Sequence, residues 1–271
     1  MAVITLTSDW RNNDYYVGAV KGKIISNNQS VTIVDINHQV LPFNNMNASF
    51  ILRNCYKEFP EGTVHIIAVN TILTAKRSLL VIEKDRQFFV CSDSGFPDLL
   101  FHEEEKDVYR VDNTNKESDT FASLEIFVDV AVKLSEGKKI ADIATKCTDY
   151  FQQLPLLPTI DTNLINGSVV FIDSYSNVIT NINKETFERV GKGNPFKIYV
   201  QSNHYVIEKI SNTYNNIPAG ELVAVFNSSG MLEIALVNGP VSELLDLKVN
   251  STIRIKFNPH KKSNELFLSG E

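Results

Sequence analysis

The chain has 271 residues, of which 43% are hydrophobic and 21% are charged, and its formal net charge is −6. This composition is that of a soluble globular protein with room for two modest domains, and it excludes a wholly disordered chain, a collagen-like repeat and a coiled coil. Because the net charge is negative, there is no general positive field to attract phosphate backbones, and we expect no nucleic-acid partner.

Strand and helix signals alternate through the first half of the chain. The run at 63–69 is apolar on both faces, as in a buried parallel strand, and the helix signals are apolar stripes at helical spacing. In chain order we expect a strand at 3–7, a helix at 15–25, a strand at 31–35, a helix at 44–56, a strand at 63–69, a strand pair at 79–83 and 87–91 close enough for a hairpin, and a helix at 124–134. This order predicts an α/β domain, a mostly parallel sheet with helices on both faces.

A proline-rich stretch, Leu154-Pro-Leu-Leu-Pro158, then separates the alternating strand and helix signals from a different pattern. Two prolines in five residues end a helix and favour an extended connector. Short strands punctuated by Asn, Gly and Ser follow, with one short helix at 184–190, and they predict a small antiparallel barrel or sandwich. We therefore expect an N-terminal α/β domain at 1–153, a linker at 154–163 and a C-terminal all-β domain at 164–271.

Several classes of protein do not fit the pattern. No apolar run reaches the ~18–20 residues of a membrane helix, and the first residues read as a strand, so we expect neither a membrane partner nor a signal peptide. Cys55, Cys91 and Cys147 are odd in number and far apart, which favours free thiols and a cytoplasmic location. The histidines lack metal-ligand spacing and no glycine-rich nucleotide motif follows the first strand, so we expect no metal and no dinucleotide cofactor.

Polar residues follow two of the expected parallel strands. Asp9 ends the first and Asn70 ends the third, and ligands of open α/β sheets bind beyond the carboxyl ends of the strands. Asp9 and Asp14 also precede a helix, where a carboxylate can simply cap it. Asn70 can be an ordinary turn residue, and Asp173 and Asn177 can make ordinary turn chemistry between two strands. Composition and spacing leave these alternatives open.

Several short motifs, spread over nearly the whole chain, occur in the same order as in a known protein family. They are Thr7-Ser-Asp9, Asp14-Tyr-Tyr-Val-Gly18, Phe59-Pro-Glu-Gly-Thr-Val-His65, Asp93-Ser-Gly95, Phe171-Ile-Asp-Ser-Tyr-Ser-Asn-Val-Ile-Thr-Asn181, Asn227-Ser-Ser-Gly230 and Leu232-Glu-Ile-Ala235. Together they resemble the S-adenosylmethionine (SAM) hydroxide adenosyltransferase family, which is related to the SAM-dependent fluorinase and chlorinase. The resemblance implies an N-terminal α/β domain, a C-terminal β-barrel and a homotrimer that binds SAM between subunits, with SAM as substrate and no cofactor.

The resemblance also implies roles for individual side chains around SAM or adenosine. Asp9 corresponds to the carboxylate that holds the ribose hydroxyls, and Phe43 to an aromatic wall beside the ribose and the reacting carbon. Asp14 and Asp173 correspond to contacts of the methionine amine, and Ser228 to a contact of the methionine carboxylate. The adenine contacts are implied for Tyr175 and Tyr214 by stacking, for Asn177 at the base edge, and for Asn238 through its backbone.

The catalytic set departs from the family pattern. Water-using members share an Asp, an Arg and a His that orient and activate the attacking water. Here the Arg is kept as Arg77, the Asp is replaced by Asn70, and the His is replaced by Ala122. An amide can hold a water molecule but cannot accept its proton at neutral pH.

Two functions of different classes follow. The first is an enzyme in which water attacks C5′ of SAM to give adenosine and methionine, slowly, with Arg77 as electrostatic orienter and Asn70 as water holder. The alternative is a catalytically inactive homologue that binds SAM or adenosine. Transfer to another nucleophile is a third hypothesis. The short Lys84-Asp-Arg86 connection disfavours a fluorinase, because the fluoride-using enzymes carry a long insertion there.

Overall fold

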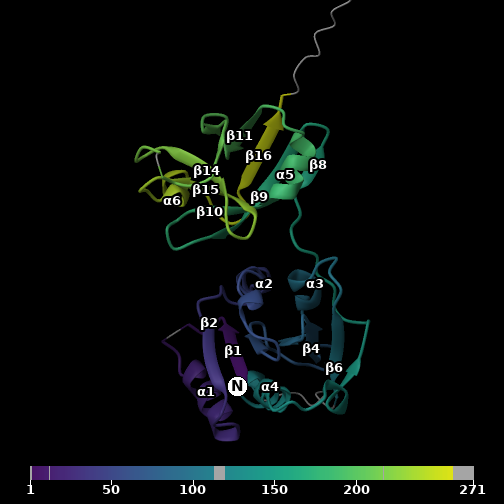
Figure 1. Ribbon diagram of the computed structural model, residues 1–271. Helices are drawn as coiled ribbons and strands as arrows, with labels where there is room; N and C mark the ends of the chain where they lie inside the picture. Colours follow the sequence, from purple (N-terminus) through teal and green to yellow (C-terminus); the bar gives the residue numbers. More distant parts are fainter. Residues whose placement is uncertain (1, 12, 113–119, 216, 259–271) are drawn as a thin grey trace, which may run out of the picture. The chain divides into compact units, whose positions relative to one another are not determined.

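The computed structural model describes residues 2–11, 13–112, 120–215 and 217–258. The chain divides into two compact units, Met1–Pro155 and Leu156–Glu271, which we call the N-terminal and C-terminal units (Figure 1). Each unit has its own buried apolar clusters.

A seven-stranded sheet forms the centre of the N-terminal unit. Its strands are β1 (Val3–Ser8), β2 (Thr32–Asn37), β3 (Val64–Ala68), β4 (Leu79–Lys84), β5 (Gln87–Ser92), β6 (Asp107–Val111) and β7 (Ala144–Lys146), in the order β2-β1-β3-β5-β4-β6-β7. The neighbours β2, β1, β3 and β5 are parallel, whereas β4, β6 and β7 pair antiparallel. The expectation of a mostly parallel sheet is therefore wrong, because the sheet is mixed.

The physical reason for the mixed sheet starts at the β4–β5 connection. Asp85 and Arg86 alone join the two strands, with φ of 52° and 57°. Two central residues with positive φ make the tight hairpin turn that reverses the chain, so β4 cannot run parallel to β5. The short strands β6 and β7, which the sequence pattern did not predict, extend the sheet from the reversed strand β4.

Helices cover both faces of this sheet, as expected. One face carries α1 (Tyr16–Asn27), the π-helical turn η2 (Ser123–Phe127) and α4 (Val128–Ser135), and the other carries α2 (Asn45–Arg53) and α3 (Phe96–Leu100) (Figure 1). Successive side chains of β3 show the alternation: Ile66 packs with the α1 and α4 cluster, and Ile67 with the α2 and α3 cluster. Two short 3₁₀ turns, η1 (Tyr56–Glu58) and η3 (Ile140–Asp142), complete the unit.

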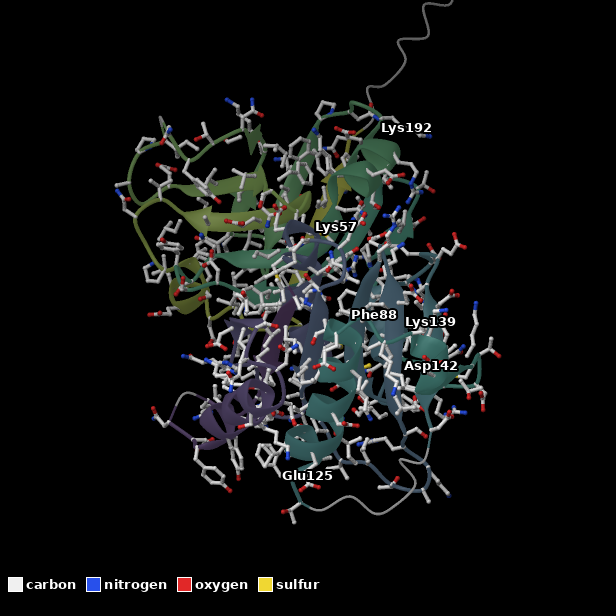
Figure 2. All side chains as sticks on the ribbon, turned by 60° about the horizontal axis from the view of Figure 1, so that its bottom comes forward. Lys57, Phe88, Glu125, Lys139, Asp142 and Lys192 are labelled. Carbon is white, nitrogen blue, oxygen red and sulfur yellow. The ribbon has the colours of Figure 1, made fainter. Side chains whose placement is uncertain are left out.

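The outer surface of the unit is charged where helical turns face solvent. Glu125 on η2, and Lys139 and Asp142 at η3, are exposed and project outward (Figure 2). In the described parts of the chain, no helix is long and apolar enough to cross a membrane, and no cluster of His, Cys, Asp and Glu could hold a metal ion.

The C-terminal unit is a nine-stranded, barrel-like sheet. Its elements are β8 (Thr159–Asp161), β9 (Leu164–Ile172), β10 (Val178–Asn183), α5 (Lys184–Gly191), β11 (Phe196–Val200), β12 (Val206–Ile207), β13 (Ile210–Ser211), β14 (Leu222–Phe226), β15 (Met231–Leu236), α6 (Val241–Leu244) and β16 (Thr252–Phe257). The strands follow the order β12-β11-β16-β9-β10-β15-β14-β13, with β8 on β9, and β12 near one end contacts β14 near the other. The sheet thus curls almost closed around one apolar cluster and is barrel-like. Because the unit also contains the helices α5 and α6, it is not purely β.

Candidate functional site

The N-terminal unit contains a polar pocket of about 430 Å³ beyond the carboxyl end of β3, which we call the N-terminal pocket. Ten residues line it: Pro42, Phe43, Asn44, Asn45, Met46, Asn70, Arg77, Ser94, Phe151 and Gln153. A site at the strand ends was expected from the open α/β sheet. The pocket brings Phe43, which precedes α2, together with Asn70 and Arg77, which both lie on the connection between β3 and β4.

Asp9 contributes to this pocket through the backbone of Phe43. The Asp9 Oδ2 atom accepts a hydrogen bond from the Phe43 N–H at 2.9 Å. Phe43 has a φ of 60°, and its side chain is 67% exposed, so the loop presents the ring instead of burying it. The capping alternative for Asp9 is wrong, because α1 has Tyr15 at its N-cap and no side-chain cap. Each carboxylate oxygen has two lone pairs, so Asp9 keeps acceptor capacity for a ligand.

Asn70 and Arg77 form a fixed pair in the pocket. The Arg77 Nη1 atom donates to the Asn70 Oδ1 atom at 3.0 Å. Reciprocal backbone hydrogen bonds between Thr74 and Arg77, 3.0 and 3.1 Å long, hold the arginine in a tight turn. Because a guanidinium has donors only, the Asn70 oxygen must face it, and the Asn70 Nδ2 group is left as a donor.

A chain of hydrogen bonds with one direction links Asn45 to Asn70. The Asn45 Nδ2 atom donates to the Ser94 backbone oxygen at 2.7 Å and to the Ser94 Oγ atom at 3.1 Å. The Ser94 and Ser92 hydroxyls are 2.9 Å apart, and the Ser92 Oγ atom donates to the Asn70 backbone oxygen at 2.8 Å. Since that carbonyl can only accept, the order of donors is fixed from Asn45 to Asn70. This chain holds Asn70, whose φ is 53°, at the end of β3.

Two positions implied by the resemblance are not gathered into the N-terminal pocket. Asp14 is exposed just before α1, and it does not cap that helix. Ala122 is 5% exposed and packs in the apolar cluster beneath α1 and α4. Its neighbour Phe121 meets Trp10 and Tyr16 edge-on, with ring centroids 5.4 and 4.9 Å apart. Within the described residues, the pocket therefore contains the Asn and Arg of the changed catalytic set but not Ala122.

The C-terminal unit contains a larger pocket of about 770 Å³, which we call the C-terminal pocket. It lies over the outward side of β14 and β15 and the turns beside them. Its lining residues are Asp173, Tyr175, Asn177, Asn212, Thr213, Tyr214, Val225, Phe226, Asn227, Ser228, Glu233, Ala235, Leu236, Val237, Asn238 and Gly239. All six residues that the resemblance implied for this half of the chain are gathered here.

Asp173 organises the turn between β9 and β10. Its Oδ1 atom accepts from the N–H groups of Tyr175 and Asn177 at 2.9 and 2.8 Å, and its Oδ2 atom accepts from the Asn177 Nδ2 atom at 3.1 Å. This is the turn chemistry considered from the sequence, and it also sets the ligand-facing side chains. The ring of Tyr175 is 79% exposed at the pocket, available for stacking.

Glu233 lies at the floor of the C-terminal pocket and was missed by sequence reasoning. Its Oε1 atom accepts from the Tyr214 hydroxyl, and its Oε2 atom accepts from the Asn227 Nδ2 atom at 3.1 Å. Burial and this carboxylate together raise the pKa of the Tyr214 hydroxyl above its usual value. The signal in the sequence was a lone carboxylate between the apolar residues of a strand, Leu232-Glu-Ile-Ala235.

Comparison with known proteins covers both units. Residues 4–144 match the SAM hydroxide adenosyltransferase N-terminal domain, and residues 167–254 match the C-terminal domain. The chain is 28% identical to the (R)-S-adenosyl-L-methionine hydrolase of Methanocaldococcus jannaschii, over 93% of this chain and 95% of that protein. It is 23% identical to the fluorinase of an Actinoplanes species, over 93% and 97% of the two chains.

The fold is also shared with a solved structure. An uncharacterized conserved protein from Thermotoga maritima superposes with a TM-score of 0.83 at 27% identity, covering 94% of this chain and 99% of that one. Two domain matches that together span most of the chain, in the order in which its two units occur, establish the assignment. The chain belongs to the SAM hydroxide adenosyltransferase family.

Proposed function

We propose that the protein hydrolyses SAM to adenosine and methionine. Water attacks C5′, a C5′–O bond forms as the C5′–S bond breaks, and the bonding electron pair goes to sulfur, which leaves as the neutral thioether of methionine. One proton of the water passes to solvent. The observation that carries the proposal is the domain match over both units, supported by hydrolase relatives that align along more than nine-tenths of the chain.

In the N-terminal pocket we assign the groups around the reacting carbon. Arg77 supplies positive charge that stabilises the hydroxide character developing on the attacking water. Asn70 holds that water through the amide group that the Arg77 contact leaves as a donor. Asp9 holds the ribose hydroxyls, and Phe43 walls the ribose. Asp14, which lies outside this pocket just before α1, is assigned to the methionine amine.

In the C-terminal pocket we assign the groups that bind the rest of SAM. Tyr175 and Tyr214 stack on adenine, and Asn177 and the backbone near Asn238 read its edge. Asp173 contacts the methionine amine, and Ser228 contacts the methionine carboxylate. The shared lining of one pocket supports these six assignments.

We further propose that the protein works as a homotrimer in the cytoplasm and without a cofactor. In the trimer, the N-terminal pocket of one copy and the C-terminal pocket of another complete one SAM site. Exposed aromatic rings at both pockets support such a contact, because Phe43 and Tyr175 leave 67% and 79% of their surface uncovered. The three cysteines are free thiols, as a reducing compartment favours.

The test is incubation of the purified protein with SAM in ¹⁸O-labelled water, followed by mass spectrometry of adenosine and methionine. We expect adenosine carrying ¹⁸O at C5′, above the spontaneous background. Unlabelled product would point to another nucleophile. Binding of SAM by calorimetry without product would contradict hydrolysis and favour the inactive, SAM-binding alternative.

A further inference from the structure

Side chains of β15 point alternately into the core and into the C-terminal pocket, and the latter form part of the pocket floor. On β15, Leu232 and Ile234 point into the core of the barrel-like sheet, whereas Glu233 and Ala235 face the pocket. Val225 of β14 pairs with Glu233 in register, so the carboxylate lies on an otherwise apolar floor. An outward-facing glutamate is ordinarily solvated, yet Glu233 is only 6% exposed.

The carboxylate of Glu233 is covered by neutral groups. Within the described parts of the chain, the groups that donate hydrogen bonds to it are a tyrosine hydroxyl and a side-chain amide. Among the described residues, no lysine, arginine or histidine lines the pocket, and neither Glu233 nor Asp173 has an ion-pair partner. A desolvated carboxylate without a counter-ion strongly favours a cation that enters the same cavity.

We propose that Glu233 is the counter-charge by which the C-terminal pocket selects a cationic adenosyl compound over neutral adenosine. The inference rests on the proposed function, in which the substrate carries a sulfonium and an ammonium group and the adenosine product carries neither. Loss of the cationic part on cleavage then removes the attraction, so the same carboxylate that favours substrate binding favours release of adenosine.

The experiment compares three ligands that differ in positive groups. SAM has a sulfonium and an ammonium group, S-adenosylhomocysteine has the ammonium group alone, and adenosine has neither. Their affinities are measured by calorimetry for the Glu233→Gln variant and its parent, both carrying Arg77→Ala so that SAM is consumed only slowly during the titration. Glutamine keeps the shape of the side chain, and the Tyr214 hydroxyl can turn to accept from its amide.

The parent is expected to bind SAM more tightly than adenosine. Glu233→Gln should weaken SAM binding roughly tenfold and leave adenosine binding within about twofold. A loss shared with S-adenosylhomocysteine locates the cation at the ammonium group, and a loss confined to SAM locates it at the sulfonium. Glu221→Gln is the matched control, because it removes one exposed carboxylate of the same unit outside the pocket and should change nothing.

Three results would overturn the assignment. An equal loss for all three ligands would mean that Glu233 only supports Tyr214 and Asn227, or reads the adenine amine. An unchanged SAM affinity would mean that the carboxylate does not sense the cation. A parent that binds adenosine as tightly as SAM would contradict the proposal even if the variant did not fold. If the wild-type protein binds SAM in preference to adenosine but forms no labelled adenosine, the proposed hydrolysis is wrong and the role of Glu233 still holds.

Discussion

The N-terminal and C-terminal pockets differ in charge and in how their polar groups are held. Arg77 lines the N-terminal pocket, and no carboxylate is among the described residues of that lining, whereas the C-terminal pocket has Asp173 and Glu233 and no cationic side chain. A guanidinium that is held in place by an amide can stabilise negative charge that develops during a reaction. The buried carboxylate of Glu233, the half-buried one of Asp173 and the exposed tyrosine rings can bind a flat, positively charged molecule. We therefore propose that the N-terminal pocket carries the chemistry and the C-terminal pocket the recognition of SAM.

Replacing Arg77 should have the largest effect and should separate the two pockets. Arg77→Ala removes the positive charge that we assign to the attacking water, and we expect turnover to fall about 10²–10³-fold while adenosine affinity is kept. Steady-state kinetics with SAM and calorimetry with adenosine measure the two quantities. The control is Lys76→Ala, which removes an exposed neighbouring charge that does not line the pocket. An unchanged rate in Arg77→Ala would show that the assignment of Arg77 is wrong.

The two units should also differ in their response to acid. His65 is fully buried on β3, with its Nδ1 atom 2.7 Å from the Thr5 Oγ1 atom and its Nε2 atom 2.6 Å from the Gln87 Oε1 atom, whereas His204 of the C-terminal unit is exposed. Burial lowers the pKa of His65 from 6.5 to about 4. Between these pH values the unfolded chain binds more protons, so stability falls as pH falls through this window.

The expected loss from His65 is up to roughly 3 kcal/mol of the unfolding free energy of the N-terminal unit between pH 6.5 and pH 4. Denaturant titrations followed by fluorescence of Trp10 measure it, since the chain has a single tryptophan and it lies in this unit. His65→Gln should flatten the pH dependence in this window. A slope that survives in the variant would assign acid sensitivity to other groups.

Restoring a carboxylate at position 70 tests what limits the chemistry of the N-terminal pocket. In Asn70→Asp, the new side chain would face the Arg77 guanidinium and could accept a hydrogen bond from the water, and we expect hydrolysis to rise about 10-fold or more. Asn70→Ala should lower the rate instead. No gain would mean that the loop at Ile72-Leu-Thr74, rather than the missing acceptor, limits attack. A histidine at position 122 is a poorer test, because Ala122 is buried in an apolar cluster.

The helices and strands of both units were largely predictable from the sequence. The strand pairing of the N-terminal sheet and the floor of the C-terminal pocket were not. Apolar periodicity found β1, α1, β3 and the β4–β5 hairpin, because each element buries one face or both. The five-residue α3 and the short β6 and β7 carry too little periodicity to detect, so the sheet was expected to be mostly parallel. Pairing partners depend on contacts between distant segments, which local patterns do not contain.

The same limit applied to the candidate site. The resemblance named residues that the structure gathers, such as Asn70 with Arg77 and Asp173 with Asn177. Their roles stay predictions. Asn45 and Glu233 were missed, since each acts through partners far away in the sequence, at Ser94 and at Tyr214. A polar residue within an apolar strand or at the start of a helix is informative only once its partner is known.

Mixing two inactive variants would test whether the two pockets of one active site come from different copies of the chain. Arg77→Ala damages the N-terminal pocket, and the double variant Tyr175→Ala, Tyr214→Ala damages the C-terminal pocket. If a homotrimer builds each site from two copies, co-expression in equal amounts should restore about a quarter of the wild-type activity, since half the N-terminal and half the C-terminal pockets are intact. Each variant purified alone is the control, and differently tagged subunits confirm mixing. Mixed trimers without activity would mean that each copy completes its own site, because every copy then carries one damaged pocket.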